Sequence, residues 1–471
     1  MKISIGFSGP AGSGINTCGT VLGNILADYG YFVYGDKQYS SLIKGGNNLF
    51  VLYISDTHHF ISRKIDHYIY FDAFSMEKNS SIYEIDTQYF IEKKSHKNQN
   101  TFAIGLAAKI LGINKEVIEE AFLERLPKAV QGENKTSLSE GFDYLIASIF
   151  NLKPLSKKNK FYFGNEVVSY GAIESGLEFY SAYPMTPASS LIDVISEDPR
   201  VTFFQGEDEI AVSMSMLGAK FAGKRSMCGT SGGGFALMSE SISFSNQAEL
   251  GGVYVLSQRA GPSTGTPTFT GQGDLNYALN ASFGDTFPIV LAPYTFENGY
   301  NLIGKALNWS DIYQHPVIFL VDKSFSEGYM SVDTTSLQAE SIRKGKIENN
   351  PASDFARYAE QTDGISPYSV PGTPNGEFIA TSYEHDIYGK ETEDNETKMQ
   401  MEAKRFRKLE TFVQDEFIEG FSGYDIINPD ANKFFITYGI NFYALQGFIH
   451  EHPDDNWGII VLKVIQPLDL R

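Results

Sequence analysis

Short apolar runs alternate with helical patterns along the N-terminal part of the chain. Apolar residues at Ile3, Ile5 and Phe7 predict a strand, and residues 21–26 have the spacing of one helix face. Further segments of strand or helix length follow at 31–34, 50–54, 67–71, 107–111 and 117–122. This alternation predicts an α/β unit over residues 1–150.

Residues 151–160, NLKPLSKKNK, interrupt the pattern with a basic, proline-containing stretch that has little to bury. We interpret it as an interdomain linker. Strand-then-helix alternation resumes over 161–332, with apolar or mixed runs at 201–204, 225–228, 252–256 and 317–321. Repeated units of this kind predict a doubly wound parallel sheet, in which ligands bind beside the carboxyl ends of the strands.

The rest of the chain is less regular. Residues 333–420 are polar, rich in turn formers and then highly charged, which predicts an extended connector that ends in a solvated helix. In 421–471, two strand-like runs, FFITYGI and WGIIVLKVIQP, flank a helical pattern. We expect a small βαβ piece that packs on its neighbours or begins a truncated domain.

Composition narrows the class of protein. The chain has 471 residues, 42% of them hydrophobic, and a net charge of −19. Its length predicts about two or three folded domains, and its charge argues against nucleic-acid and anionic-membrane partners. No apolar run has the length of a membrane span, and the N-terminus lacks the apolar core of a signal peptide, so we expect a cytoplasmic protein.

The cysteines predict a reducing compartment. The two cysteines, Cys18 and Cys228, lie far apart in sequence, and no CxxC motif occurs. A disulfide framework is therefore not expected. The same spacing predicts that this chain does not by itself hold an iron–sulfur cluster or a structural zinc ion.

The first candidate site is SAYPMTPASS, residues 181–190. Pro187 suits the first position of a helix, which makes Thr186 the natural N-cap. Its hydroxyl and the free backbone N–H groups could then receive a carboxylate or a phosphate. Spacing alone favours a plainer interpretation, in which the threonine only caps a helix.

The second candidate is a group of three acids, Glu207, Asp208 and Glu209, before a helical pattern rich in small residues. In the plainer interpretation they form a charged first turn that complements the helix dipole. In the alternative, one of them faces inward. A carboxyl in an apolar pocket holds its proton more tightly and is suited to hydrogen-bond a ring nitrogen.

Two further motifs follow at predicted strand ends. The turn 228–234 is rich in glycine, which lets the backbone approach a ligand or another chain, but it lacks the Lys-Ser/Thr pair of a Walker A loop. Arg259 comes directly after the strand VYVLS. Its guanidinium could grip a substrate carboxylate with two N–H groups, and pairing with a neighbouring acid is an equal alternative.

The N-terminal turn, residues 9–14, lies between a predicted strand and a predicted helix. A dinucleotide or coenzyme A phosphate could rest there. The glycine spacing is not GxGxxG, so a tight strand–helix turn is the plainer interpretation.

Taken together and in order, these motifs resemble the pyrimidine-binding domain of 2-oxoacid:ferredoxin oxidoreductase α subunits. The resemblance lies in SAYPMTPASS, QGEDEIAVSMSMLGAKFAGKRSMCGTSGGGFALMSE and SQRAGPSTGTPT. SGPAGSGINTCG and QYSSLIKGGNN resemble the γ domain of that family. The γ–α order and the segments DGISPYSVPGTPNG, EHDIYG and KRFRKLE are similar to the 2-oxoglutarate and broad 2-oxoacid branch.

The resemblance implies an α/β architecture with several parts. A Rossmann-like γ domain at 1–150 and a linker at 151–160 precede a doubly wound parallel-sheet domain at 161–332, which would bind the pyrimidine ring of thiamine diphosphate. A connector at 333–420 and the start of a transketolase C-terminal-like domain at 421–471 would follow.

The implied activity is the oxidative decarboxylation of a 2-oxoacid with coenzyme A, giving acyl-CoA, CO2 and reduced ferredoxin. Thiamine diphosphate would bind between this chain and a β subunit, in an αβ or (αβ)2 assembly. In the family, Mg²⁺, the diphosphate site and a 4Fe–4S cluster belong to the β subunit. The absence of a GDG motif and of cluster cysteines from this sequence fits that division.

The resemblance also implies roles for individual residues. Glu209 matches the glutamate that hydrogen-bonds the aminopyrimidine ring, and Thr186 and Arg259 match the residues that hold the 2-oxoacid carboxylate. The residues expected beside the cofactor are Tyr183, Pro184, Gly232 and Gly233. Those expected on the coenzyme A side are Gly12, Ser13, Gly14, Lys44, Gly45 and Gly46.

The sequence departs from the family pattern at Gly233, where TSGPG is usual, at Asn47 in place of the histidine of KGGHN, and at Tyr368 in place of the arginine of SPR. Two rival functions are a nucleotide-dependent dehydrogenase and a non-catalytic assembly subunit. The first needs an acidic ribose-binding residue after a GxGxxG turn, which the sequence lacks. The combination of Thr186, Glu209 and Arg259 argues against the second.

Overall fold

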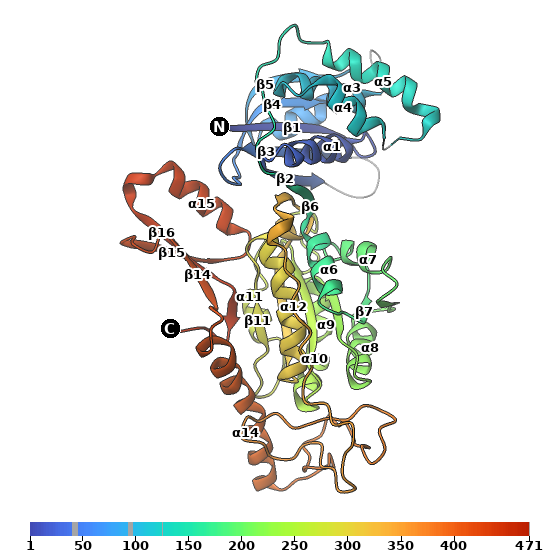
Figure 1. Cartoon of the computed structure of the whole chain (residues 1–471), viewed down its shortest axis with the longest axis vertical. Helices are drawn as coiled ribbons and strands as arrows, with labels where there is room; N and C mark the ends of the chain where they lie inside the picture. The colour runs from blue at the N-terminus through green and yellow to red at the C-terminus, as the bar shows by residue number, and fades with distance from the viewer. Residues whose placement is uncertain (40–45, 93–97, 125, 471) are drawn as a thin grey trace. The chain divides into compact units, whose positions relative to one another are not determined.

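The chain forms two compact units in the computed structural model, which describes residues 1–39, 46–92, 98–124 and 126–470 (Figure 1). Unit 1 comprises Met1–Gly164, Glu327–Ser336 and Tyr443–His452, and unit 2 comprises Asn165–Ser326, Leu337–Phe442 and Pro453–Arg471. The domain ranges expected from the sequence stay predictions. Within the described ranges, no helix is long and apolar enough to cross a membrane.

Unit 1 is built on a seven-stranded mixed sheet in the order β5–β4–β1–β3–β2–β13–β6. β1 runs parallel to β4 and antiparallel to β3. The strands are β1 (Lys2–Pro10), β2 (Phe32–Tyr39), β3 (Asn47–Ser55), β4 (Lys64–Tyr70), β5 (Glu84–Phe90), β6 (Lys160–Phe163) and β13 (Tyr329–Val332). The helices are α1 (Ile15–Asp28), α2 (Ala73–Ser80), α3 (Gln99–Leu111), α4 (Lys115–Leu123) and α5 (Lys128–Phe142).

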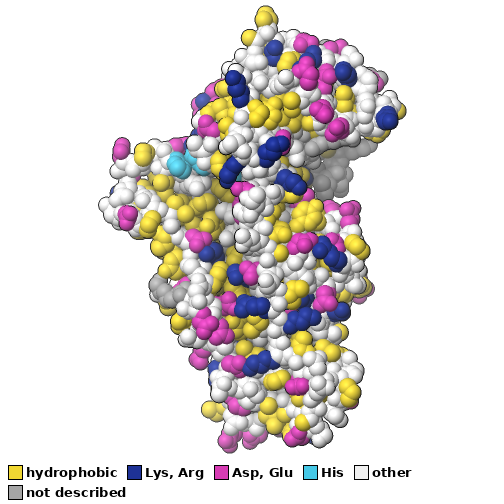
Figure 2. Space-filling model, viewed as in Figure 1, with side chains coloured by type: hydrophobic (Ala, Val, Ile, Leu, Met, Phe, Trp, Pro, Cys, Tyr) yellow, Lys and Arg dark blue, Asp and Glu magenta, His cyan; other side chains and the backbone are white. Residues whose placement is uncertain are grey.

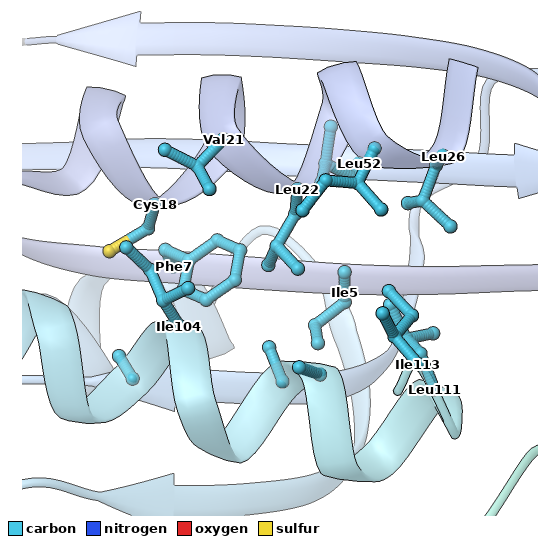
Figure 3. Packing of buried hydrophobic residues seen from close by; sticks show 14 of the residues in the cluster. Ile5, Phe7, Cys18, Val21, Leu22, Leu26, Leu52, Ile104, Leu111 and Ile113 are labelled. Carbon is cyan, nitrogen blue, oxygen red and sulfur yellow. The ribbon is translucent and has the colours of Figure 1, made fainter. Parts of the chain in front are cut away.

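The core of unit 1 lies between the sheet and its helices (Figure 3). Ile5 and Phe7 on β1 are fully buried and face Leu22 of α1 and Ile104 of α3. The predicted α/β character of this part of the chain is confirmed. Its final strands come from beyond residue 150, because β13 pairs with both β2 and β6.

The stretch expected to be an interdomain linker packs on unit 1, and it buries one apolar side chain there. Leu152 is buried in the core of unit 1. The backbone N–H of Leu155 donates to the Tyr29 carbonyl at 2.6 Å, and that of Asn159 donates to the Ala27 carbonyl at 2.9 Å. Backbone hydrogen bonds, which do not depend on side-chain type, therefore hold this basic stretch in place.

Unit 2 contains a seven-stranded sheet in the order β17–β11–β12–β10–β9–β7–β8, and all pairs except β11–β17 are parallel. The predicted parallel sheet is confirmed. The strands are β7 (Phe179–Ala182), β8 (Thr202–Gln205), β9 (Ser226–Thr230), β10 (Gly252–Gln258), β11 (Ile289–Leu291), β12 (Pro316–Asp322) and β17 (Val464–Gln466). The helices along this part are α6 (Gly164–Glu174), α7 (Ser190–Ile195), α8 (Glu209–Phe221), α9 (Gly232–Leu237), α10 (Ser239–Gln247), α11 (Leu275–Leu279), α12 (Phe296–Ile312) and α13 (Lys323–Glu327).

The connector has little regular structure before helix α14 (Asn395–Phe412), which continues as a π-helical turn, Val413–Ile418. Short 3-10 turns lie at Thr334–Ser336 and Pro453–Asp455. A three-stranded sheet follows in the order β14–β16–β15. Its strands are β14 (Tyr424–Ile427), β15 (Lys433–Tyr438) and β16 (Trp457–Leu462), and α15 (Asn441–Glu451) connects the parallel pair β15–β16.

The expectation of a solvated helix in the connector is wrong. Lys404 and Lys408 of α14 are almost fully buried, and both reach the carboxylate of Glu249. The sequence pattern predicted solvent-facing lysines here because lysine is rarely buried without an oppositely charged partner. The partner of these two lysines, Glu249, lies far away in sequence. Elsewhere, acidic and basic side chains are interspersed over the face in view (Figure 2).

Candidate active site

The candidate site lies at one edge of the parallel sheet in unit 2. β9 lies between β7 and β10, and all three run in the same direction. Their last residues are Ala182, Thr230 and Gln258, so the segments that follow begin at a common edge. This places the SAYPMTP segment, the glycine turn and Arg259 at the carboxyl ends of neighbouring strands, where parallel sheets bind ligands.

The three acids at the start of α8 have different environments. Glu207 is exposed. Asp208 is the N-cap, and its carboxylate accepts a hydrogen bond from the Ala211 N–H at 2.8 Å. Glu209 is only 3% exposed and begins the helix. Capping fixes Asp208 at the helix end, and the helix then turns the next side chain inward.

The glycine turn closes around Glu209. Its Oε1 lies 3.4 Å from the hydroxyl oxygen of Thr230, the last residue of β9. A Cβ at Gly234 would collide with both Glu209 Oε1 and Thr230 Oγ1. Glycine is thus required at position 234 by close approach and not by backbone angles.

The rest of the turn forms a cradle of backbone atoms. A Cβ at Gly233 would meet nothing within 4 Å, so that side of the turn is open. Ser231 Oγ is buried and has no hydrogen-bond partner among the residues that the structure describes. An open backbone edge, an orphan hydroxyl and a buried carboxylate together suit a flat polar ring with nitrogen atoms.

Thr186 does not cap a helix, so that sequence-based expectation is wrong. Residues 186–189 form a turn, the Thr186–Pro187 peptide bond is cis, and α7 begins at Ser190. The Asn165 side chain donates to the Pro187 carbonyl at 2.9 Å. This tertiary hydrogen bond occupies a carbonyl that an earlier helix start would have used.

Arg259 reaches the same segment. Its Nη1 donates to the Thr186 carbonyl at 2.7 Å, so the structure brings together the two residues that the sequence assigned to a carboxylate. Burial lowers the pKa of Arg259, and the negative charge of Asp274 opposes this shift. The remaining N–H donors of the guanidinium suit a carboxylate.

Asp274 is a site residue that the sequence did not single out. A Cβ at Gly232 would lie 2.6 Å from Asp274 Oδ2, so its carboxylate lies against the glycine turn. Burial raises the pKa of Asp274, and Arg259 lowers it. The sequence pattern had left open whether Arg259 pairs with a neighbouring acid, but nothing local marked this aspartate as that acid.

Tyr183 and Pro184 follow β7 directly and are both exposed. Other apolar side chains around the start of α8 and the end of α9 are also exposed, including Phe204, Ile210 and Leu237. Large apolar groups next to a buried polar site are typical of a surface that another chain covers.

Two models of known families match this sequence. Residues 170–405 match pyruvate flavodoxin/ferredoxin oxidoreductase, thiamine diphosphate-binding, and residues 4–81 match pyruvate ferredoxin/flavodoxin oxidoreductase. The chain belongs to the pyruvate flavodoxin/ferredoxin oxidoreductase family. The resemblance seen in the sequence is thereby confirmed.

Individual members of this family are similar over most of their length. The 2-oxoacid:ferredoxin oxidoreductase subunit alpha of Saccharolobus solfataricus is 30% identical over 93% of this chain and 83% of that protein. The protein of the same name from a Sulfolobus species is 28% identical over 99% of this chain and 87% of its own length.

A solved structure agrees over the whole chain. The 2-oxoglutarate:ferredoxin oxidoreductase from Magnetococcus marinus, with 2-oxoglutarate, coenzyme A and succinyl-CoA bound, has a TM-score of 0.87 and 26% identity. The match covers 100% of this chain and 89% of that one. The α/β fold expected from the family is therefore confirmed.

The motif of the family's γ domain forms a compact turn in unit 1. Gly12, Ser13 and Gly14 lie between β1 and α1, and the Ser13 hydroxyl donates to the Pro10 carbonyl at 2.6 Å. Pro10 pairs with Asn47 across β1 and β3, so Gly46 lies at the same end of the sheet. Lys44 and Gly45 lie outside the described residues.

Proposed function

We propose that this chain is the γ-fused α subunit of a thiamine diphosphate-dependent 2-oxoacid:ferredoxin oxidoreductase. The reaction would convert a 2-oxoacid and coenzyme A to acyl-CoA and CO2 and pass two electrons to ferredoxin. The observation that carries the proposal is the buried Glu209 carboxylate, held against Thr230 and the glycine turn at the carboxyl edge of the sheet. Membership of the family supports it.

The residues of unit 2 fit the pyrimidine ring of the cofactor. Glu209 would accept or share a proton at a ring nitrogen. Ser231, which directly follows Thr230, has an orphan hydroxyl, and Gly233 leaves an open backbone edge. When bound, thiamine diphosphate supplies the carbon nucleophile for the 2-oxo group and receives the electrons that CO2 leaves behind. Tyr183, Pro184 and Gly232 complete the proposed cofactor contacts.

Glu209 lies where a side chain could exchange a proton with the bound pyrimidine ring. Because it is buried, its interaction with a ring nitrogen is little screened by water. Gly234 and Thr230 restrict its carboxylate to one place, which lowers the reorganisation needed when the proton moves. We therefore assign Glu209 as the catalytic residue of this chain.

Thr186 and Arg259 are assigned to the substrate carboxylate. The hydrogen bond from Arg259 to the Thr186 carbonyl fixes the guanidinium beside the segment that carries the Thr186 hydroxyl. A charged donor and a neutral donor are then available to one carboxylate. The 2-oxoglutarate bound in the Magnetococcus marinus enzyme is consistent with an acid of this class.

A partner subunit follows from the incomplete site. We propose that a β subunit supplies Mg²⁺, the diphosphate contacts and a 4Fe–4S cluster, in an αβ or (αβ)2 assembly. The subunit names of the relatives imply an assembly of several chains, and the exposed Tyr183, Phe204, Ile210 and Leu237 offer an apolar surface for one. Coenzyme A is assigned to Gly12, Ser13, Gly14 and Gly46 of unit 1, together with Lys44 and Gly45.

The test is co-production of this chain with its β subunit, followed by an assay of low-potential dye reduction. The expected result is reduction that requires the 2-oxoacid, coenzyme A and both chains together. Pyruvate and 2-oxoglutarate are the first substrates to compare. An assembled, cluster-containing complex that reduces no dye with any 2-oxoacid would favour the non-catalytic alternative.

A further inference from the structure

We propose that Asp274 is the resident counter-charge of Arg259. In this role it weakens the binding of the 2-oxoacid carboxylate before the reaction, and it compensates the guanidinium after that carboxylate has left as CO2. Asp274 is thus a positioning residue that acts through Arg259. The inference rests on the proposed function and deepens it.

The fold holds Asp274 beside Arg259 through the strand that precedes the arginine. The Asp274 backbone N–H donates to Gln258 Oε1 at 3.1 Å. Gln258 is fully buried, ends β10 and directly precedes Arg259 in sequence. The aspartate and the arginine are therefore fixed to the same strand end, although a long loop separates them in sequence.

The carboxylate of Asp274 is directed at the site and not at its own helix. Asp274 has the N-cap position of α11, yet its side chain accepts no capping hydrogen bond. Instead, both carboxylate oxygens lie within 3.0 Å of the position that a Cβ on Gly232 would take. Gly232 begins the turn whose other end, Gly234, contacts Glu209. Two carboxylates thus lie at opposite ends of one glycine turn.

Arg259 and Asp274 interact through space without direct contact. Burial lowers the pKa of Arg259 and raises the pKa of Asp274, and the charge of each residue opposes the shift of the other. Among the described residues, no carboxylate oxygen lies within ion-pair distance of Arg259, and its hydrogen bond goes to the neutral Thr186 carbonyl. A second carboxylate can therefore bind the guanidinium directly, while Asp274 stays near enough to repel it.

The charge balance of decarboxylation gives this arrangement a function. Before the reaction, the substrate carboxylate pairs with Arg259 and is repelled by Asp274. The bond between the carboxyl carbon and the 2-carbon then breaks, the electron pair stays on the 2-carbon, and neutral CO2 leaves. The repulsion disappears and Asp274 remains to compensate a half-buried guanidinium. Ground-state repulsion that is relieved during a reaction raises kcat and also KM.

The test compares Asp274→Asn with the wild-type complex of both subunits. The expected result is that KM for the 2-oxoacid and kcat both fall, each by about threefold to tenfold. The dissociation constant of oxamate, a non-reacting carboxylate analogue, should fall by a similar factor in the presence of thiamine diphosphate. Asp274→Glu, which keeps the charge, should restore most of the wild-type KM.

The matched control is Asp193→Asn, which makes the same chemical change at an exposed position of α7 in the same unit. It should leave KM, kcat and oxamate binding unchanged. If Asp274→Asn does not fold, judged by its melting temperature, Asp274→Ser replaces it, since serine also suits a helix start. The same fall in KM and oxamate dissociation constant is then expected.

An unchanged or higher KM and oxamate dissociation constant in a folded, neutral Asp274 variant would overturn the inference. That result would leave the proposed function intact, because the wild-type complex would still turn over its substrate. A wild-type complex that holds its clusters and does not turn over would instead contradict the proposed function, and the inference would fail with it.

Discussion

The carboxylate of Glu209 and the hydroxyl of Thr230 lie 3.4 Å apart, in the space that a side chain on Gly234 would occupy. One residue begins helix α8, the other ends strand β9, and the glycine lets the next helix approach both. The position of the only buried acid at the start of α8 therefore depends on three elements at once. Substitutions at these residues should distinguish effects on turnover from effects on the stability of the fold.

Glu209→Gln should abolish most of the activity while the complex still assembles. Glutamine has nearly the same shape but cannot hold the proton, so turnover should fall on the order of a hundredfold or more. Dye reduction and the melting temperature measure the two effects. Glu207→Gln, at an exposed position two residues earlier, is the control and should stay near wild type. Undiminished turnover by Glu209→Gln would point to a non-catalytic subunit.

Gly234→Ala should lower stability as well as activity. The new methyl group would collide with Glu209 Oε1 and Thr230 Oγ1, and such overpacking costs about 1 to 3 kcal/mol. Gly218→Ala is the matched control, because Gly218 lies within α8 and a Cβ there meets nothing within 4 Å. It should stabilise the helix by about 0.5 to 1 kcal/mol. Urea unfolding of the isolated chain distinguishes the two variants, and equal stabilities would contradict the predicted collision.

Arg259→Gln should weaken substrate binding. Loss of a charged hydrogen-bond donor to the carboxylate predicts a KM that is about tenfold to a hundredfold higher. Arg200→Gln is the control, since Arg200 is exposed and its guanidinium pairs with Asp198 and Glu174 on the surface of unit 2. A KM for Arg259→Gln that equals that of Arg200→Gln would remove Arg259 from the substrate site.

The buried cluster under α14 predicts a pH dependence of stability. Burial lowers the pKa of Lys408 to about 7, although Glu249 opposes this shift. An unfolded lysine titrates near pH 10, so between about pH 7 and pH 10 the unfolded chain binds more protons than the folded chain. The free energy of unfolding should therefore rise with pH across this window, and the contribution of Lys408 should level off below about pH 7, where both states bind the proton.

Lys408→Met should reduce this slope, as measured by urea unfolding at pH 7, 8 and 9. Lys398→Met changes the same residue type at an exposed position of the same helix and should leave the slope unchanged. Parallel slopes for wild type and Lys408→Met would show that Lys408 keeps its proton throughout. Each variant is compared with the wild type because other buried groups also titrate in this range.

The amino-acid sequence alone predicted several strands and helices of both units, and the family. These features depend on neighbouring residues: alternation of apolar positions, glycine at turns and acids at helix starts. It also placed Arg259 at the end of a strand, which the structure confirms. Local patterns carry this information because backbone geometry repeats over a few residues.

Only the tertiary structure decided which side chains meet. Asn165 takes the carbonyl that would have extended α7 to Pro187. Asp274 is bound to Gln258, which precedes Arg259, and Glu249 draws two lysines of a seemingly solvated helix into the interior. In each case the partner lies well outside the local pattern. A hydrogen bond or ion pair of this kind leaves no mark in the periodicity of either segment, because its energy depends on distance in space and not along the chain.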